Sequence, residues 1–269
     1  MPELPEVETA RAVIAEAALD REIAAVDDSD TWVCRPLPPG QIAAALVGRR
    51  LVAANRRGKT MWCDTSDDGP VLSLHLGMSG RIVVTDPDGH PVEGGDPVRG
   101  LSAVSPDRDP VWDRFTIEFA DGGVLRLFDK RRLGRVGLDP DLTRLGPDAG
   151  QVRASDFRVR MSRGRAPVKA RLLDQSVIAG VGNLLADETL WQARLDPHRR
   201  VDTLDRRDLD VLLRALRAAT KRAIRRGGVH TGEVIAHRKP DGHCPRCGSP
   251  MARATVGGRT TWFCPVEQV

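Results

Sequence analysis

The spacing of apolar residues changes in three stages along this chain. Residues 2–20 carry apolar side chains at helical intervals, which predicts one amphipathic helix. From residue 22 to residue 139 the pattern becomes short alternating or apolar runs bounded by Gly, Pro and Asp, such as VLSLHLGMSGRIVV and RFTIEF. Runs of this kind predict an antiparallel sandwich or barrel. The stretch 86–110 is rich in Pro, Gly and Asp, and we expect a long, partly mobile loop there.

Helical patterning returns beyond residue 150. It predicts helices around 153–160, 167–179, 184–193 and 205–227, the last capped by Thr203 or Asp205. Within this region the segment SVIAGVGNLLADETL predicts a helix, a tight glycine turn and a second helix that starts at Asn183. We therefore expect an α+β chain with three domains, at residues 1–140, 150–230 and 237–269.

Charge divides the chain in the same way. Residues 1–150 carry 18 Lys/Arg against 25 Asp/Glu, whereas residues 151–239 carry 20 against 10. A basic second half favours contact with a polyanion, although an arginine-rich solvated surface would have the same composition. No run of about twenty apolar residues and no signal-peptide pattern is present, so we expect a cytoplasmic protein without a membrane partner.

The start of the chain, MPELPEVET, offers unusual chemistry. If Met1 is removed, Pro2 presents a secondary amine directly before the carboxylate of Glu3. An α-amino group titrates near about 7.7–8.0, so a useful fraction is nucleophilic at neutral pH. Attack on a sugar aldehyde carbon gives an iminium ion, an electron sink that favours elimination of neighbouring phosphates. A proline that only starts a helix, with acidic residues in its first turn, is the competing interpretation.

Further candidates suit contact with phosphate or with DNA bases. The turn Gly180-Val181-Gly182 before Asn183 leaves backbone N–H groups bare at a helix start, where Asn183 can cap the helix and reach an anion. RRGK presents Lys59, and HLGMSGR places Met78 on a glycine-flanked loop tip, which suits a wedge between bases. DKRRLGR is a second basic turn. Each of these motifs alone is more often structural.

The C-terminal region has the spacing of a zinc ribbon. Cys244, Cys247 and Cys264 follow the pattern C-x2-C-x16-C and fill three of the four ligand positions. The fourth position is Glu267, with His243 or His237 as a nearby substitute. A hairpin without metal is the alternative. The GGR sequence between the cysteines predicts a hairpin tip that presents Arg259 to solvent or to phosphate.

Taken together and in order, PELPEVE, RRGK, HLGMSGR, DKRRLG, DQSVIAGVGNLLADETLW and CPRCG…GGRTTWFC resemble the formamidopyrimidine-DNA glycosylase / endonuclease VIII family, from residue 2 to residue 264. The resemblance implies an N-terminal β-sandwich with a leading helix, a helix–two-turn–helix domain and a zinc-ribbon hairpin with one Zn²⁺. It implies a monomeric base-excision-repair glycosylase and AP lyase that binds damaged or abasic double-stranded DNA in the cleft between the two halves and excises oxidised bases.

The resemblance also implies individual roles. Pro2 becomes the Schiff-base nucleophile, Glu3 the acid that protonates the sugar ring oxygen, and Glu6 a supporting carboxylate. As an acid at neutral pH, Glu3 needs a raised pKa, for which burial is the expected cause. Lys59 and Asn183 would hold the phosphates around the extruded nucleotide, and Arg259 would serve the second elimination. Met78, Arg131 and Leu133 would fill the gap left in the duplex. His75, Lys169 and Gly182 are further DNA-binding candidates.

Four departures from the family pattern bear on this interpretation. Glu267 stands where the family usually has the fourth cysteine, and Leu133 stands where many members have Phe. The chain has no Tyr, and only sixteen residues separate Gly227 from Cys244, where purine-type members carry a longer loop that covers the oxidised purine. A non-catalytic DNA-binding protein of the same fold and an RNA- or ribosome-associated protein are the alternatives.

Overall fold

The computed structural model describes residues 2–95 and 109–269. Its contacts divide the chain into two compact units. Unit 1 comprises Met1–Pro2 and Glu6–Leu142, and unit 2 comprises Glu3–Pro5 and Thr143–Val269. The predicted helical and finger segments therefore share one unit, and three residues from the start of the chain pack with them. No helix among the described residues is long and apolar enough to cross a membrane.

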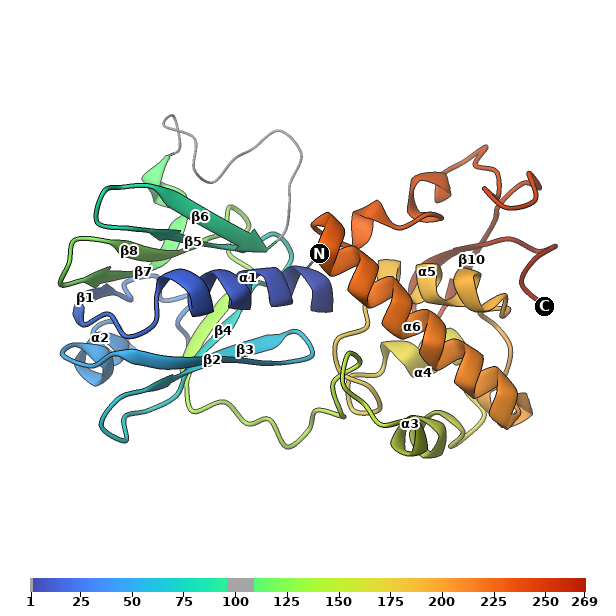
Figure 1. Cartoon of the computed structure of the whole chain (residues 1–269), viewed down its shortest axis with the longest axis horizontal. Helices are drawn as coiled ribbons and strands as arrows, with labels where there is room; N and C mark the ends of the chain where they lie inside the picture. The colour runs from blue at the N-terminus through green and yellow to red at the C-terminus, as the bar shows by residue number, and fades with distance from the viewer. Residues whose placement is uncertain (1, 96–108) are drawn as a thin grey trace. The chain divides into compact units, whose positions relative to one another are not determined.

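Unit 1 contains two antiparallel sheets, as predicted (Figure 1). The five-stranded sheet has the order β1-β7-β8-β5-β6, with β1 at Ile23–Asp27, β7 at Asp113–Phe119, β8 at Val124–Phe128, β5 at Arg81–Thr85 and β6 at Pro91–Gly95. The four-stranded sheet has the order β2-β3-β4-β9, with β2 at Leu51–Arg57, β3 at Thr60–Thr65, β4 at Leu72–His75 and β9 at Arg135–Leu138.

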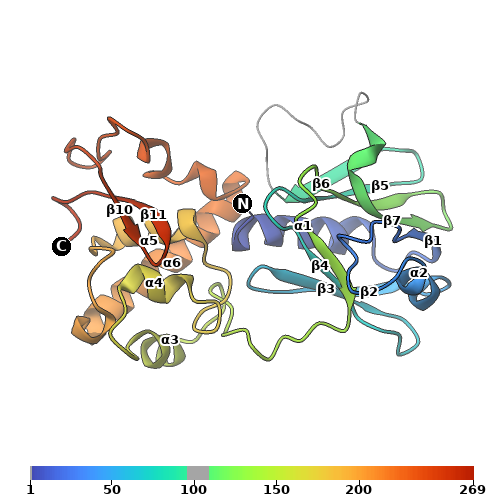
Figure 2. The ribbon, with the colours of Figure 1, turned by 180° about the vertical axis from the view of Figure 1, so that it is seen from behind.

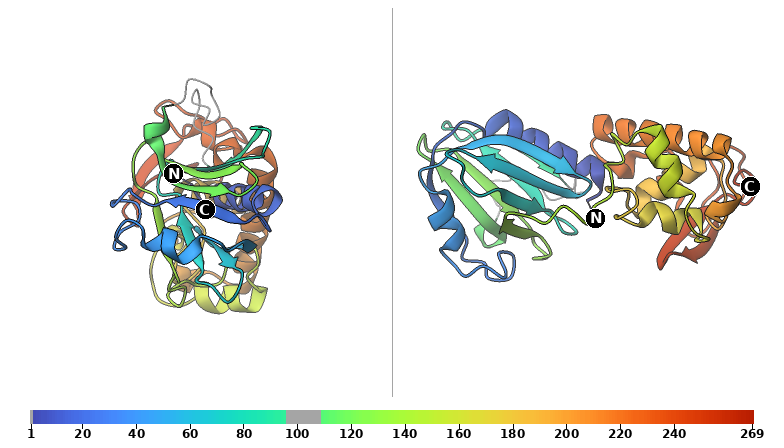
Figure 3. Two further views of the ribbon diagram at one scale, coloured as in Figure 1. Left: turned by 90° about the vertical axis from the view of Figure 1, so that its left-hand side faces the viewer. Right: turned by 90° about the horizontal axis from the view of Figure 1, so that it is seen from below.

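A single apolar core joins the two sheets to helix α1 (Leu4–Ala17). Val7, Ala10 and Ile14 of α1 are buried in this core, at the helical spacing from which the helix was predicted. Leu72 and Leu74 of β4 and Leu125 and Leu127 of β8 enter it from alternate positions of their strands. Figure 3 shows the strands from the end and from below. The alternating pattern of the sequence thus identifies the buried face of each sheet.

Two predictions about unit 1 need correction. Residues 91–95 form strand β6, which pairs with β5, so the segment 86–110 is not wholly a loop; its residues 96–108 lie outside the described residues. The described residues resume at Asp109, which caps a 3-10 turn at Pro110–Trp112. Helix α2 (Gln41–Leu46) was not predicted. Its first backbone N–H groups bind the carboxylate of Asp28, a partner more than ten residues away that local sequence does not reveal.

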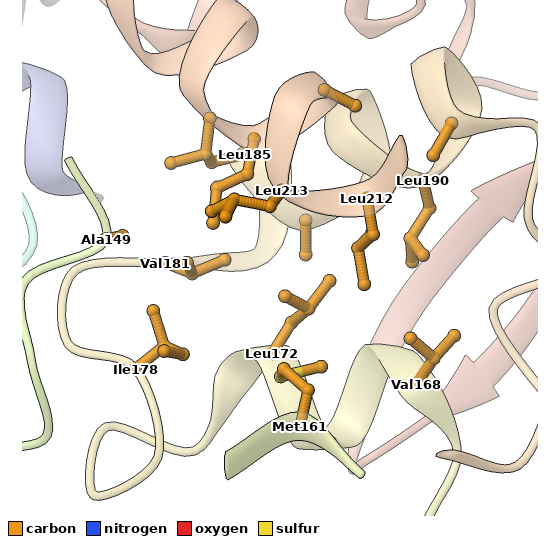
Figure 4. Packing of buried hydrophobic residues seen from close by; sticks show 14 of the residues in the cluster. Ala149, Met161, Val168, Leu172, Ile178, Val181, Leu185, Leu190, Leu212 and Leu213 are labelled. Carbon is orange, nitrogen blue, oxygen red and sulfur yellow. The ribbon is translucent and has the colours of Figure 1, made fainter. Parts of the chain in front are cut away.

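Unit 2 is a helical body with a β-hairpin. Its helices α3 (Ala154–Met161), α5 (Asn183–Ala193) and α6 (Arg206–Arg226) begin and end close to the predicted positions. Asp205 caps α6 through a capping box, as one of the two predicted caps. Figure 4 shows their shared core, in which Leu172, Leu185 and Leu213 point toward one another. Short 3-10 turns lie at Val201–Thr203, Val229–Thr231 and Ile235–His237.

Helix α4 (Val168–Leu173) is much shorter than the predicted helix at 167–179, and residues 174–179, directly before the glycine turn, are not helical. Side chains of the next two residues explain the early end. Asp174 accepts a hydrogen bond from the backbone N–H of Ser176, and Gln175 bonds to both Gly180 N and Val181 O. These bonds satisfy backbone groups that a helix would otherwise pair, and they stabilise a folded loop with helix-like apolar spacing.

The hairpin consists of β10 (Ala252–Val256) and β11 (Arg259–Phe263). Gly257 and Gly258 both have positive φ, as a two-residue hairpin turn of this kind requires. Figure 2 shows the hairpin beside α4 and α5, and β11 contacts α5. The predicted hairpin tip is confirmed, and Arg259 is exposed directly after it.

Candidate active site

The carboxylate of Glu3 lies at the N-terminus of helix α5. Its two oxygens accept hydrogen bonds from the backbone N–H groups of Gly182 (3.0 Å), Leu184 (2.9 Å) and Leu185 (3.0 Å). The helix dipole adds favourable interaction with negative charge at this position. Glu3 is also buried. The carboxylate is thus held by three backbone donors at the start of α5.

Asn183 does not cap helix α5, which corrects the prediction. Gly182 is the N-cap residue, and Asn183 is the first helical residue, whose Nδ2 donates to the carbonyl of Thr260 at 3.0 Å. Gly182 is needed for space, because a Cβ there would lie 2.2 Å from the Glu3 carboxyl carbon. Glu3, 179 residues away in sequence from Gly182, takes the capping position that was predicted for Asn183.

Lys169 was expected to contact DNA, but the structure places its side chain fully inside unit 2. Its Nζ lies 2.6 Å from Asp187 Oδ1 and donates to Thr261 Oγ1 at 2.7 Å. The other oxygen of Asp187 accepts from Arg238 Nε at 2.7 Å. Burial lowers the pKa of Lys169, and the nearby Arg238 charge acts in the same direction, whereas Asp187 and Glu3 oppose that shift. Lys169 therefore serves this internal network in the described structure, and its contact with DNA stays a prediction.

The network fixes the strand that begins with Arg259. Lys169 and Asn183 both donate to the carbonyl of Thr260, the neighbour of Arg259. Asp187 accepts from the backbone N–H of Trp262 at 3.3 Å, farther along the same strand. The backbone that bears the exposed Arg259 is thus tied to the first turns of α4 and α5.

Unit 1 holds Pro2, Glu6 and Lys59. Glu6 is buried in the first turn of α1. Lys59 follows Gly58, which has positive φ, in the tight turn between β2 and β3. His75 ends β4, and its Nδ1 accepts from the backbone N–H of Gly77 at 3.0 Å. Burial lowers the pKa of His75, and the positive charge of Lys59 lowers it further, so the two side chains share one electrostatic environment.

Two neighbouring loops of unit 1 carry the predicted wedge residues. Met78 lies between β4 and β5, and its side chain is 37% exposed. Arg131 and Leu133 lie between β8 and β9, and Leu133 is 36% exposed. Two partly exposed apolar side chains on loop tips are available for insertion into another molecule.

The three cysteines of the C-terminal region lie together. The Sγ atoms of Cys244, Cys247 and Cys264 fall within 4.8 Å of one another, and those of Cys247 and Cys264 are 3.5 Å apart. Tetrahedral zinc with Zn–S bonds of about 2.3 Å places sulfur atoms about 3.8 Å apart, so the cluster fits the ion. Burial disfavours ionisation of Cys244, but hydrogen bonds from Trp191 and from backbone N–H groups outweigh it and lower the pKa of this thiol to about 7.

The predicted fourth ligand is placed elsewhere. The carboxylate of Glu267 pairs with Arg246 at 3.3 Å and with Arg194 at 3.4 Å, and it does not join the cysteine cluster. Its backbone N–H instead donates to Cys264 Sγ at 3.4 Å. His243 and His237 are also outside the cluster in the described structure. Three thiols, and neither the carboxylate nor a histidine, form the candidate metal centre.

Comparison with known proteins identifies the family of this chain. The model of the formamidopyrimidine-DNA glycosylase N-terminal domain matches residues 1–136, and that of the formamidopyrimidine-DNA glycosylase H2TH domain matches residues 145–234. The chain belongs to the formamidopyrimidine-DNA glycosylase family. A formamidopyrimidine-DNA glycosylase of Nocardioides sp. is 35% identical to this chain. The match covers all of this chain and 94% of that protein. One from Thermomicrobium roseum is 34% identical, with 98% of each chain covered.

A solved structure gives the same result. The complex between the Lactococcus lactis Fpg and an abasic site containing DNA matches with a TM-score of 0.79 and 25% identity, over 99% of both chains. The chain is therefore a DNA-binding glycosylase of base-excision repair, in a family characterised by AP lyase activity. Sequence reasoning missed two supporting carboxylates, Asp187 and Asp129. Both lie inside the motifs LLADETLW and DKRRLG, in which the basic and amide side chains were the candidate DNA contacts.

Proposed function

We propose that this glycosylase attacks the sugar of a damaged nucleotide with the amine of Pro2. The nitrogen bonds to C1′ as the bond between C1′ and the base breaks, and the proton of the amine passes to the departing base. Glu3 then donates a proton to the ring oxygen, the C1′–O4′ bond breaks and the iminium ion forms. The resulting iminium ion acidifies the C2′ proton, whose loss expels the 3′ phosphate; a second elimination expels the 5′ phosphate. The position of the Glu3 carboxylate at the start of α5 is the observation that carries this proposal.

The phosphates around the extruded nucleotide are held, in this proposal, by Lys59, Asn183 and Arg259. Lys59 lies in a two-residue turn and Arg259 directly after one, where a side chain reaches solvent without distorting a strand. Asn183 Nδ2 is bonded to Thr260 and would exchange that carbonyl for a phosphate oxygen. Glu6 supports the reacting end of the chain, and His75 adds a neutral imidazole beside Lys59. Phosphate contacts of this type position DNA without reading sequence.

Met78, Arg131 and Leu133 would fill the gap that the extruded nucleotide leaves. A base must leave the stack before its glycosidic bond can react, and an inserted side chain compensates part of the lost stacking. The exposure of Met78 and Leu133 on adjacent loops supports this role.

We propose that Cys244, Cys247 and Cys264 hold a structural Zn²⁺. The ion would cross-link the two ends of the hairpin that presents Arg259, and small ribbons of this kind depend on such a cross-link for stability. Its contribution is structural, and it takes no part in the reaction at the sugar.

The lesion preference is proposed from the linker between α6 and Cys244. Its residue Val234 is buried, and its backbone N–H donates to Glu188 Oε2 at 3.0 Å. A Cβ on the neighbouring Gly232 would lie 2.7 Å from the same oxygen, so the linker is packed closely onto α5. A short linker fixed in this way is poorly suited to cover an 8-oxoguanine base. We therefore expect abasic sites, formamidopyrimidines and oxidised pyrimidines to be preferred over 8-oxoguanine.

A panel of duplexes tests this preference. Single-turnover rates would be measured on otherwise identical DNA that contains an abasic site, a formamidopyrimidine, an oxidised pyrimidine or 8-oxoguanine. The proposal expects 8-oxoguanine to react most slowly, and a highest rate on 8-oxoguanine would contradict it. DNA binding without cleavage of any substrate would instead favour a non-catalytic member of the family.

A further inference from the structure

The two wedge loops are brought together by the topology of unit 1. The first loop, residues 76–80, leaves the four-stranded sheet after β4 and enters the five-stranded sheet at β5. The second, residues 129–134, leaves the five-stranded sheet after β8 and enters the four-stranded sheet at β9. Because β4 pairs with β9 and β5 pairs with β8, the two loops cross between the sheets side by side.

The carboxylate of Asp129 links these loops. Asp129 is fully buried, and its Oδ1 accepts from Ser79 Oγ at 2.9 Å and from Arg131 N at 3.0 Å. Its Oδ2 accepts from Leu133 N at 2.8 Å and from Gly134 N at 2.7 Å. One donor thus comes from the residue after Met78, and two come from Arg131 and Leu133 themselves.

The loop backbones also touch. A Cβ added to Gly77, whose φ is +59°, would lie 2.3 Å from the carbonyl carbon and oxygen of Leu133. The base of the second loop is fixed in turn, because Asp129 donates to Trp112 O at 2.9 Å and accepts at its carbonyl from Arg114 Nε at 2.9 Å. Asp129 is therefore the point at which both loops are attached to the sandwich.

We propose that Asp129 is a positioning residue that holds Met78, Arg131 and Leu133 together as one rigid wedge. The inference rests on the proposed role of these three side chains in filling the gap in the duplex. Insertion between bases costs unstacking energy, and loops that had to be ordered at the same moment would add a conformational cost. A buried carboxylate that accepts four hydrogen bonds fixes the loops before DNA binds.

The variant Asp129→Asn tests this role. An amide has one acceptor oxygen, so the substitution leaves backbone N–H groups of the second loop facing an NH2 group. A milder variant, Ser79→Ala, removes only the bond from the first loop. Asp121→Asn is the matched control, since Asp121 is an exposed carboxylate in the β7–β8 turn that pairs with Arg21. Thermal unfolding of each variant would show that the fold is retained.

The measurement compares one abasic oligonucleotide as a duplex and as a single strand. A single strand has no gap to fill, so the wedge matters only for the duplex. We expect Asp129→Asn to lower the single-turnover lyase rate on the duplex about tenfold, with less than about a twofold change on the single strand. Ser79→Ala should shift the duplex rate in the same direction by less, and Asp121→Asn should shift neither rate.

Equal losses on duplex and single strand would show a general structural role and overturn the inference. An unchanged duplex rate in Asp129→Asn would overturn it as well, provided that Leu133→Ala and Met78→Ala slow the duplex reaction. If those two truncations leave the duplex rate unchanged, the proposed wedge itself is wrong. Cleavage of the single strand tests the sugar chemistry independently of both.

Discussion

Lys169 Nζ lies 2.6 Å from Asp187 Oδ1, and both side chains are buried. Lys169 comes from α4 and Asp187 from α5, and each also bonds to the strand that follows Arg259. The pair therefore connects three elements of unit 2 at the place where the proposed phosphate ligand Asn183 begins its helix. A buried ion pair of this kind determines the relative positions of the groups around it.

We expect Lys169→Met to lower the free energy of unfolding by about 3 kcal/mol, because it leaves the Asp187 carboxylate buried with one cation fewer. Urea unfolding followed by tryptophan fluorescence would measure the change. Lys221→Met, at an exposed lysine of α6, is the control and should change stability by less than about 0.5 kcal/mol. If Lys169→Met keeps full stability and loses only DNA affinity, the result would instead support a direct contact between Lys169 and DNA.

Glu3→Gln should separate release of the base from cleavage of an abasic site. Loss of the proton donor removes general acid catalysis, which contributes about 10²- to 10⁴-fold, so base release should slow by that range. An abasic sugar already has an accessible aldehyde, so covalent trapping on abasic DNA should persist. Glu8→Gln is the matched control, since Glu8 lies on helix α1, which begins directly after Glu3, and pairs with Arg11 and Arg56. Equal loss of both reactions in Glu3→Gln would argue against the acid role.

Zinc content should depend on the cysteines and not on Glu267. Atomic absorption on purified protein should give about one zinc per chain in the wild type. Glu267→Gln should keep the metal, since the carboxylate is paired with Arg246 and Arg194, whereas Cys264→Ser should lose it. Loss of zinc from Glu267→Gln would show that the carboxylate moves to the ion. Wild-type protein with far less than one zinc per chain would contradict the metal site.

Stability should fall with acidity in a way that depends on His75. Burial and the charge of Lys59 lower the pKa of this imidazole, so the folded protein keeps it neutral at pH values where the unfolded chain, with a pKa near about 6.5, takes up a proton. The unfolding free energy should therefore decrease as the pH falls below about 6.5 and through the folded pKa. His75→Gln should reduce that decrease, and an identical pH dependence in both proteins would contradict the shifted pKa.

Much of the secondary structure follows from local patterns. Apolar spacing predicted α1, α5 and α6, and the paired glycines predicted the hairpin before Arg259. The wrong predictions share one physical cause. In each case a side chain, either nearby or distant in sequence, forms hydrogen bonds with backbone groups that the local pattern assigns to other partners. Gln175 and Asp174 ended α4 early, and Asp28 supports a helix start that local sequence does not reveal.

The candidate site shows the same limit. The motifs identified Glu3 and Asn183, but not that Glu3 occupies the helix start that was predicted for the Asn183 side chain. The burial of Lys169 depends on Asp187 in another helix and on Thr261 in the hairpin, 92 residues away. Periodicity places residues on faces of elements, whereas pairing between elements becomes visible only in three dimensions.

Borohydride trapping tests the central chemistry most directly. Reduction of the iminium ion would join the protein covalently to an oligonucleotide that contains one abasic site, and mass spectrometry of the adduct would locate the bond. The account expects wild-type protein without Met1 to form this adduct at residue 2, and Pro2→Gly to form far less. Absence of a trapped species with the wild type, or a bond to a lysine, would contradict the role of Pro2.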